Sequence, residues 1–267
     1  MTAKVVTLIN EKGGVGKTST VAATSAALAH MGYNVCVIDT DTQGHIAIRF
    51  KREPEDCFYS LMQGHSWRDI LRPIPPSYYG SKPENGALLW LVPSAAATRE
   101  LDNSLNARQL IQRLDQIRET FDFIFFDTSP RLGAIHAALF VASDFILIPT
   151  ECTTLSVRGV VSTMNHIEAA TTKAAEAGLS VGQILGIVPT KFNGSKKVHY
   201  QNLGWLGGKY GNESLLSPIR FLADWEKAEA KQMPIHLYNP RSAAAADTRN
   251  LVRQILAATK AEAHAQA

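Results

Sequence analysis

Residues 12–18 read Lys-Gly-Gly-Val-Gly-Lys-Thr, and this glycine-rich stretch decides the fold. Before it, Lys4–Asn10 is a short apolar run rich in β-branched residues, which is typical of a buried strand. After it, Lys17–Met31 is an alanine-rich stretch of good helix formers. Strand, glycine-rich loop and helix in this order is the context that favours a phosphate-binding loop over a glycine-rich turn that binds nothing.

The residue types of this loop suit a polyphosphate. Small residues leave backbone N–H groups free to surround a β-phosphate, and the N-terminus of the following helix adds positive potential. Lys17 can reach the β- and γ-phosphate oxygens, and Thr18 can ligate Mg²⁺. The strict pattern GxxxxGK[ST] begins with glycine, but this sequence has Glu11 at that position. The expected nucleotide-binding residues of the loop are Lys12, Gly13, Gly14, Val15, Gly16, Lys17, Thr18 and Ser19.

Carboxylates follow two further apolar runs. Asn34–Asp39 reads as a buried strand, and Asp41 comes just after it. Residues 123–126 are Phe-Ile-Phe-Phe, and Asp127 follows directly, as in a Walker B strand. Because open α/β sheets bind ligands at the carboxyl ends of their strands, we expect these aspartates beside the phosphate loop, with Asp127 holding Mg²⁺ through water. The alternative is that they are surface aspartates in turns.

The apolar runs are continuous instead of alternating, as a sheet covered on both faces requires. We therefore predict an α/β fold with a doubly wound, mostly parallel sheet flanked by helices, in one domain spanning residues 1–267. Residues 51–85, with several prolines, are expected to form short helices and loops of unassigned role. The alanine-rich tail from Ser242 should be helical and frayed from about residue 259. The remaining predicted strands are Leu88–Val92, Phe145–Ile148 and Ile184–Val188.

Bulk composition narrows the class of protein. A net charge of +3 and a pI near 8.7 permit contact with nucleic acid without requiring it. Cys36, Cys57 and Cys152 form no CxxC pair, which argues against a disulfide framework or a zinc site and fits packed thiols in a reducing compartment. No apolar stretch reaches the ~18 residues of a membrane span, so we expect a cytoplasmic protein.

Taken together, these motifs resemble those of the ParA, MinD and nitrogenase iron protein superfamily, and the ParA family in particular. Lys12 is the mark of its deviant Walker A motif. Residues 39–45 resemble the family's D-x-D-P-Q-G-N, with Thr42 and His45 departing from it, and residues 127–133 resemble D-x-P-P-x-L-G, with Ser129 in place of the first proline. The resemblance continues through residues 138–149 and covers most of the chain, so it also implies a P-loop NTPase fold.

The resemblance implies roles for individual residues. Lys12 would cross a dimer interface to the nucleotide of the partner, so that two monomers enclose two ATP molecules. Asp41 would orient or deprotonate the attacking water, and Asp39 would lie near the Mg²⁺ shell. Thr190 and Pro218 match places that contact the base. ATP itself is implied by the family alone.

Three functions are compatible with these motifs, and they differ in testable residues. A reductase like the nitrogenase iron protein needs paired cysteines for an iron-sulfur cluster, and Cys152 is the only cysteine just beyond a strand end in its half. A MinD-like protein needs an amphipathic C-terminal helix that binds membranes, whereas residues 251–256 carry only a modest apolar stripe. We therefore expect no stable membrane association.

A ParA-like partition ATPase is the third function and the one we expect. The resemblance implies an ATP-dependent homodimer that binds nonspecific DNA, associates with the nucleoid, and has its hydrolysis stimulated by a ParB-like partner on the cargo. The cargo, whether plasmid, chromosome or protein assembly, stays open. Nonspecific DNA binding uses basic side chains against phosphates. The basic residues that we expect to contact DNA are Lys196, Lys197, Arg220, Arg241 and Arg249.

Overall fold

The computed structural model describes residues 2–80, 88–131 and 133–265, with side chains described as far as Thr259. Within these ranges the strands form one seven-stranded sheet in the order β3-β4-β2-β5-β1-β6-β7. All neighbours pair in parallel except β3 and β4, which are antiparallel. The strands are β1 (Lys4–Leu8), β2 (Val35–Asp39), β3 (Arg72–Pro73), β4 (Leu89–Val92), β5 (Phe123–Asp127), β6 (Phe145–Glu151) and β7 (Gln183–Thr190).

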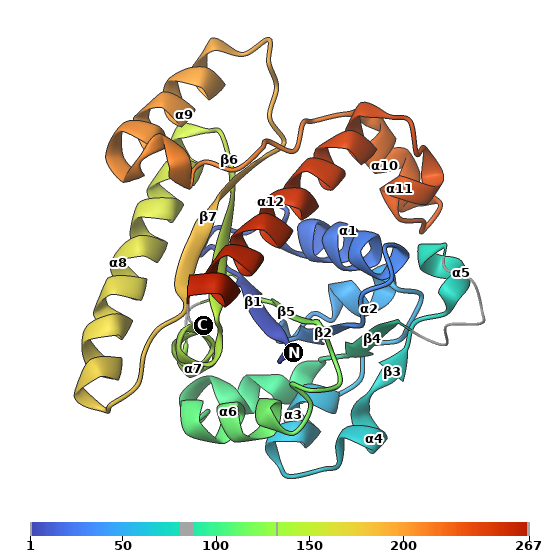
Figure 1. The fold of residues 1–267 in the computed structure, drawn as a ribbon, viewed down its shortest axis with the longest axis vertical. Helices are drawn as coiled ribbons and strands as arrows, with labels where there is room; N and C mark the ends of the chain where they lie inside the picture. Colours follow the sequence, from blue (N-terminus) through green and yellow to red (C-terminus); the bar gives the residue numbers. More distant parts are fainter. Residues whose placement is uncertain (1, 81–87, 132, 266–267) are drawn as a thin grey trace.

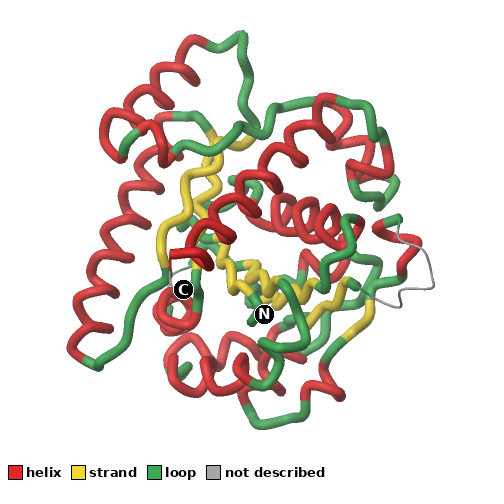
Figure 2. The backbone as a smooth tube through the Cα atoms, viewed as in Figure 1, coloured by secondary structure: helices red, strands yellow, loops and turns green. Residues whose placement is uncertain are grey.

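Helices cover both faces of this sheet, as the ribbon and the tube both show (Figure 1, Figure 2). One face packs against α1 (Lys17–His30) and α12 (Ala243–Ala265), and the other against α6 (Ala107–Asp115), α7 (Ala134–Ala142) and α8 (Thr154–Glu176). The other helices are α2 (His45–Arg49), α3 (Cys57–Met62), α4 (Trp67–Ile70), α5 (Pro76–Tyr79), α9 (Lys197–Tyr210), α10 (Ala223–Ala230), α11 (Ile235–Tyr238) and the 3-10 helices Ala96–Asn103 and Asn212–Ser214.

The continuous apolar runs are explained by burial on both sides. In β1, Val6 and Leu8 pack towards α1 and α12, whereas Val5 packs towards α6 and α7. Every residue of β2 and of β5 is buried. The predicted doubly wound, mostly parallel sheet is therefore confirmed, and the strand positions agree with the predicted runs to within a few residues.

The segment between β2 and β4 contains more sheet than we predicted. It forms the short helices α3, α4 and α5 as expected, but Arg72 and Pro73 also add an antiparallel edge strand beside β4. Proline suits such a position because an edge strand leaves one side without backbone hydrogen bonds. The part of the prediction that falls on residues 81–85 lies outside the described residues.

The C-terminal helix packs on its own sheet. Leu251, Val252 and Ile255 are buried in the hydrophobic core that α12 forms with α1 and the sheet. The apolar stripe of the C-terminal helix therefore faces this core. The helix continues to Ala265, and the fraying expected from about residue 259 stays a prediction. None of the described helices is long and apolar enough to cross a membrane. The three cysteines are buried free thiols, as expected.

Candidate nucleotide site

The carboxyl ends of three neighbouring strands bring the predicted site together. β5 lies between β1 and β2, and Asp127 pairs in register with Leu8 on one side and with Asp39 on the other. The loop that leaves β1 contains the glycine-rich residues, and it runs directly into α1. The sheet therefore places the phosphate loop and the two strand-end aspartates at one edge, as the sequence predicted.

The phosphate loop has the backbone that an anion requires. Gly14 and Gly16 have φ angles of 76° and 85°, a left-handed region that favours glycine. Gly16 caps α1 without any side-chain hydrogen bond, and the first turn of α1 contains no acidic residue. The first N–H groups of the helix are therefore free for an anion, and the helix dipole favours negative charge there.

Lys17 lies inside the loop. Its residue is only 6% exposed, and Nζ donates to the carbonyl oxygens of Asn10 at 2.9 Å and Lys12 at 3.3 Å. Burial lowers the pKa of Lys17, while the negative charges of Asp127 and Asp41 oppose that shift. The ammonium group of Lys17 thus lies within the phosphate loop and is hydrogen-bonded only to neutral carbonyl oxygens. Charged phosphate oxygens, which form stronger hydrogen bonds, can replace these carbonyl oxygens as acceptors.

Asp39 and Asp127 are buried carboxylates with unused oxygens. One oxygen of Asp39 and both oxygens of Asp127 have no hydrogen-bond partner of ordinary geometry. Burial raises the pKa of Asp127 to about 7, against the opposing effects of the Thr18 hydroxyl and the Lys17 charge, and burial beside Asp127 raises that of Asp39. Buried charges are normally paired or coordinated to metal, so this arrangement fits a cation.

The residues present fit a Mg²⁺ ion that is bound together with nucleotide phosphates. Over the described parts of the chain, no group of three or more His, Cys, Asp and Glu residues could hold a metal by itself. Magnesium is commonly bound by one or two carboxylates together with substrate phosphates and water. Asp39 and Asp127 would be those carboxylates, the Thr18 hydroxyl would complete the protein groups, and the bound ion would neutralise phosphate charge.

Asp41 stands at the mouth of the site. Its backbone N–H donates to Oδ1 of Asp39 at 2.9 Å, and its own Oδ1 accepts from the N–H of Gln43 at 3.0 Å. The residue is half-buried, so water can reach its carboxylate. Gly44, with a φ of 62°, then turns the chain into α2. Asp41 is therefore anchored by its backbone while its side chain remains accessible.

Lys12 points away from its own phosphate loop. Its side chain is 32% exposed, and Nζ donates to Oγ of Ser156 at 2.6 Å and lies 3.5 Å from Glu151. Glu151 also accepts from Nζ of Lys191 at 2.8 Å. Burial alone would raise the pKa of Glu151, but the two lysines hold it below its ordinary value. The two lysines of the motif thus differ, since Lys17 faces the loop and Lys12 faces the surface.

Sequence reasoning missed Glu151, Ser156 and Lys191 as members of this site. A signal existed for Glu151, because it is the last residue of β6 and strand ends of this sheet converge on the site. Lys191 follows the end of β7 in the same way and adopts a φ of 48°, which is unusual for a residue other than glycine. Ser156 belongs to α8 and had no such signal.

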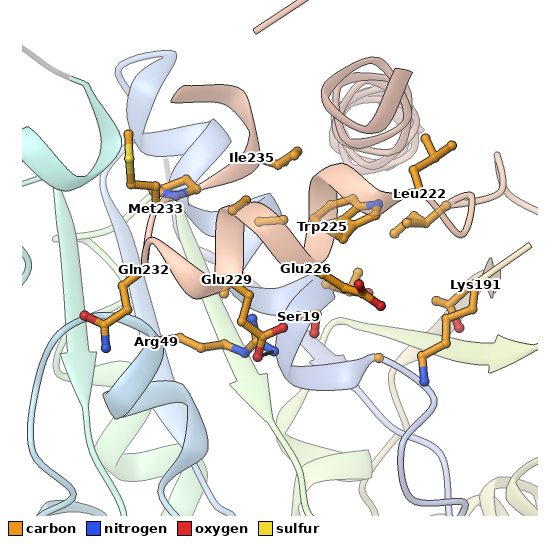
Figure 3. A pocket seen from close by; sticks show the side chains of 18 of the residues that line it. Ser19, Arg49, Lys191, Leu222, Trp225, Glu226, Glu229, Gln232, Met233 and Ile235 are labelled. Atoms are coloured by element: carbon orange, nitrogen blue, oxygen red, sulfur yellow. Dashed lines mark hydrogen bonds and ion pairs between the residues drawn. The ribbon is translucent and has the colours of Figure 1, made fainter. Parts of the chain in front are cut away.

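A cavity of about 380 Å³ adjoins the start of α1 (Figure 3). Its lining includes Ser19 of α1 together with Thr190 and Ile219. Trp225 and Glu229 of α10 also line it. Thr190 also donates from Oγ1 to the carbonyl oxygen of Val15 at 2.7 Å. The predicted base-contacting residue Thr190 therefore lies between the phosphate loop and the cavity. Pro218 does not line the cavity, whose wall here begins at Ile219.

The basic residues predicted to contact DNA belong to separate elements. Lys196 and Lys197 are at the start of α9, whereas Arg241 lies in the α11–α12 connection and Arg249 on α12. Arg220 is engaged differently: its guanidinium donates to Asp247 at 2.7 Å and lines the cavity. Its guanidinium therefore already has an acidic partner within the protein, while 44% of the side chain is exposed.

A parallel α/β sheet with a phosphate loop after β1 and carboxylates after β2 and β5 defines a P-loop nucleotide-binding protein. A family profile described as an AAA domain matches residues 3–180, more than half of the chain. The chain belongs to the ParA/Soj/MinD family of deviant Walker A ATPases.

Individual relatives agree with this family. The chain is 25% identical to the chromosome-partitioning ATPase Soj of Treponema pallidum over 256 residues, covering 95% of this chain and 97% of that one. Its fold is similar to that of apo McdA from Cyanothece, with a TM-score of 0.80, 20% identity and coverage of 95% and 99%. It is also similar to cobyrinic acid a,c-diamide synthase from Mycobacterium smegmatis with bound ADP and magnesium, with a TM-score of 0.76, 21% identity and coverage of 97% and 96%.

Proposed function

We propose that this protein hydrolyses ATP with Mg²⁺ and uses the ATP-bound state to form a homodimer that positions cargo on nonspecific DNA. In this cycle Lys12 of each copy reaches the nucleotide of the other, and hydrolysis releases the dimer. A ParB-like adaptor bound to the cargo accelerates hydrolysis. The protein acts in the cytoplasm, where its ATP-bound form associates with the nucleoid.

The main support for the proposal is that Lys12 and Lys17, the two lysines of the motif, lie in different surroundings. Lys17 is buried and fills its own phosphate loop, whereas Lys12 is 32% exposed and bonds to Ser156 and Glu151 outside the loop. Because Lys12 does not face its own phosphate loop, its charge is suited to contact the nucleotide bound by a second copy of the chain. A polyanion at the interface would then draw Lys12 out of its contact with Glu151.

Hydrolysis needs a positioned water and a neutralised phosphate. Bound Mg²⁺ would supply charge neutralisation at the phosphates, held by Thr18, Asp39 and Asp127. Asp41 is anchored by its backbone at the mouth of the site, so its carboxylate can orient the attacking water or accept its proton. Lys17 and the first N–H groups of α1 hold the phosphates in place.

The dimer is tested by light scattering with and without ATP. Lys12→Ala should lose ATP-dependent dimerisation while still binding nucleotide through Lys17, and Lys173→Ala, an exposed lysine on α8, is the matched control. Asp41→Ala should trap the dimer because hydrolysis fails. Turnover by Asp41→Ala at the wild-type rate, or dimerisation of Lys12→Ala at the wild-type ATP concentration, would show the respective role to be wrong.

DNA binding is tested by cosedimentation with DNA and with anionic liposomes, with and without ATP, over a series of salt concentrations. We expect ATP-dependent binding to DNA that weakens as salt rises, because phosphate contacts release counterions. The basic residues divide between α9 and the α11–α12 region, so Lys196→Ala with Lys197→Ala and Arg241→Ala with Arg249→Ala form two separate tests. Binding to liposomes alone would instead indicate a MinD-like function at membranes.

A further inference from the structure

Glu11 occupies the position where the strict phosphate-loop pattern has glycine, and the proposed cycle assigns it no role. Its carboxylate accepts from Oγ of Ser162 at 2.7 Å and from Nδ1 of His166 at 2.5 Å. Its backbone N–H lies 3.4 Å from Oγ1 of Thr163, to which it donates. Because an ionised carboxylate only accepts hydrogen bonds, Nδ1 of His166 carries the proton in this contact. Glu11 thus makes all three contacts with α8.

The same helix also contacts the residues on either side of Glu11. Ser156 accepts the hydrogen bond from Lys12, and a Cβ added to Gly159 would lie 2.9 Å from Oδ1 of Asn10 and 3.3 Å from Cβ of Lys12. Helix residues three and four positions apart share a face. Positions 156, 159, 162, 163 and 166 therefore form one face of α8 on which the start of the phosphate loop rests.

We propose that Glu11 is a positioning residue that fixes the start of the phosphate loop on α8, so that Lys12 is presented to the nucleotide of a second copy. This inference rests on the proposed ATP-dependent dimer. The two side-chain contacts of Glu11 hold the backbone one residue before Lys12, and Gly159 lets the helix approach it closely. When Lys12 leaves Ser156 for a phosphate across the interface, its backbone keeps its place because Glu11 remains bound to α8.

The charge of the Glu11–His166 contact is not the main reason why Glu11 would position Lys12. The side chain of His166 is 50% exposed and that of Glu11 is 21% exposed, and ion pairs in such positions add little to stability. The contact matters through geometry, because two hydrogen bonds to one carboxylate fix both its position and its orientation. The effect is thus expected in dimer formation, which needs Lys12 placed within about 0.5 Å, more than in folding.

Three variants separate this role from simple stability. Glu11→Ala removes both side-chain contacts, and Glu11→Gln keeps an oxygen that can accept from Ser162. On the helix side, Ser162→Ala combined with His166→Ala removes the same contacts without altering the phosphate loop. Glu168→Gln, which changes an exposed carboxylate of α8, is the matched control. Each protein is titrated with a non-hydrolysable ATP analogue in light scattering, with ADP in a binding assay, and is melted to confirm its fold.

Glu11→Ala and the helix double variant should each need about tenfold more ATP analogue for half-maximal dimerisation, because the hydrogen bonds to an ionised group are lost. Glu11→Gln should fall between them and wild type. Affinity for ADP, which needs no second copy, should stay within about twofold of wild type. Wild-type dimerisation with unchanged analogue dependence in Glu11→Ala would overturn the inference, as would a fall in ADP affinity equal to the loss of dimer. A wild-type protein that never dimerises would instead overturn the proposed function.

Discussion

Replacing Asp127 by Asn should stabilise the nucleotide-free, metal-free protein at neutral pH. The carboxylate lies fully inside the sheet edge, beside Asp39 in register on β2, and neither of its oxygens has a hydrogen-bond partner of ordinary geometry. A charge in such a place is costly unless a metal or a partner neutralises it. The residue that we propose as a Mg²⁺ ligand is therefore a source of instability whenever Mg²⁺ is absent.

The magnitude and the sign follow from the pKa. Burial raises the pKa of Asp127 from the ordinary 3.8 to about 7, so between these two pH values the folded protein holds a proton that the unfolded chain has released. The contribution of Asp127 to folding stability therefore falls as pH rises from about 4 to about 7 and is level above that. A difference of about three units, at 1.36 kcal/mol each, sets an upper limit of about 4 kcal/mol. The gain in Asp127→Asn should be smaller, because the buried amide also lacks partners.

The assay is urea unfolding in EDTA near pH 5 and near pH 8. Buried histidines such as His136 give both proteins the opposite pH dependence, so the quantity to compare is the difference in stability between them. Asp127→Asn should exceed the wild type near pH 8, and this advantage should shrink near pH 5. Asp69→Asn, at an exposed position on α4, is the control. Added Mg²⁺ and ADP should stabilise the wild type more than Asp127→Asn. An Asp127→Asn protein that is less stable than wild type near pH 8 without metal would refute the reasoning.

Three further predictions concern other parts of the chain. Gly44→Ala should cost about 2 kcal/mol or more in urea unfolding, because φ is 62° and a Cβ would lie 2.9 Å from the carbonyl oxygen of Ser94, whereas Gly178→Ala, at a φ of 66° but in open space, should cost less. Burial lowers the pKa of His136 to about 4, so below about pH 6.5 the unfolded chain takes up a proton that the folded protein does not. The free energy of unfolding therefore falls by up to about 3 kcal/mol as pH drops from about 6.5 to about 4, and His136→Gln should reduce the loss measured between pH 7 and pH 5. Trp225→Phe should diminish the change in tryptophan fluorescence on ATP titration, because Trp225 lines the cavity beside the phosphate loop; an undiminished change would place the base elsewhere.

The fold could be predicted because each parallel strand is buried on both faces. That burial leaves a continuous apolar run, and β2 and β5 are examples in which every residue is inside. The aspartates could be predicted for a related reason: Asp39 and Asp127 are the last residues of these strands, and parallel strands end at one edge. A short edge strand such as β3, with two residues, has no comparable pattern.

Contacts between distant segments could not be predicted, because no local period encodes them. Arg220 looked like a free basic residue, but Asp247 from α12 binds it. No sequence pattern singled out Trp225, but α10 packs so that it lines the cavity beside α1. In both cases the partner lies on another element, and only the folded chain brings the two together. A charge count along a sequence therefore does not show which cations already have a partner in the folded chain.

Not every glycine of the strict phosphate-loop pattern is required by the backbone, as position 11 shows. Gly14 and Gly16 have left-handed φ angles, so a side chain there would be strained, whereas Glu11 is not among the residues with positive φ. The backbone at position 11 therefore does not require glycine, and the side chain present contacts α8. A departure at position 11 leaves the phosphate site intact, while one at position 14 or 16 would not. Glu11→Gly would restore the strict pattern and yet remove two contacts with α8, so it should impair dimerisation without improving ADP binding.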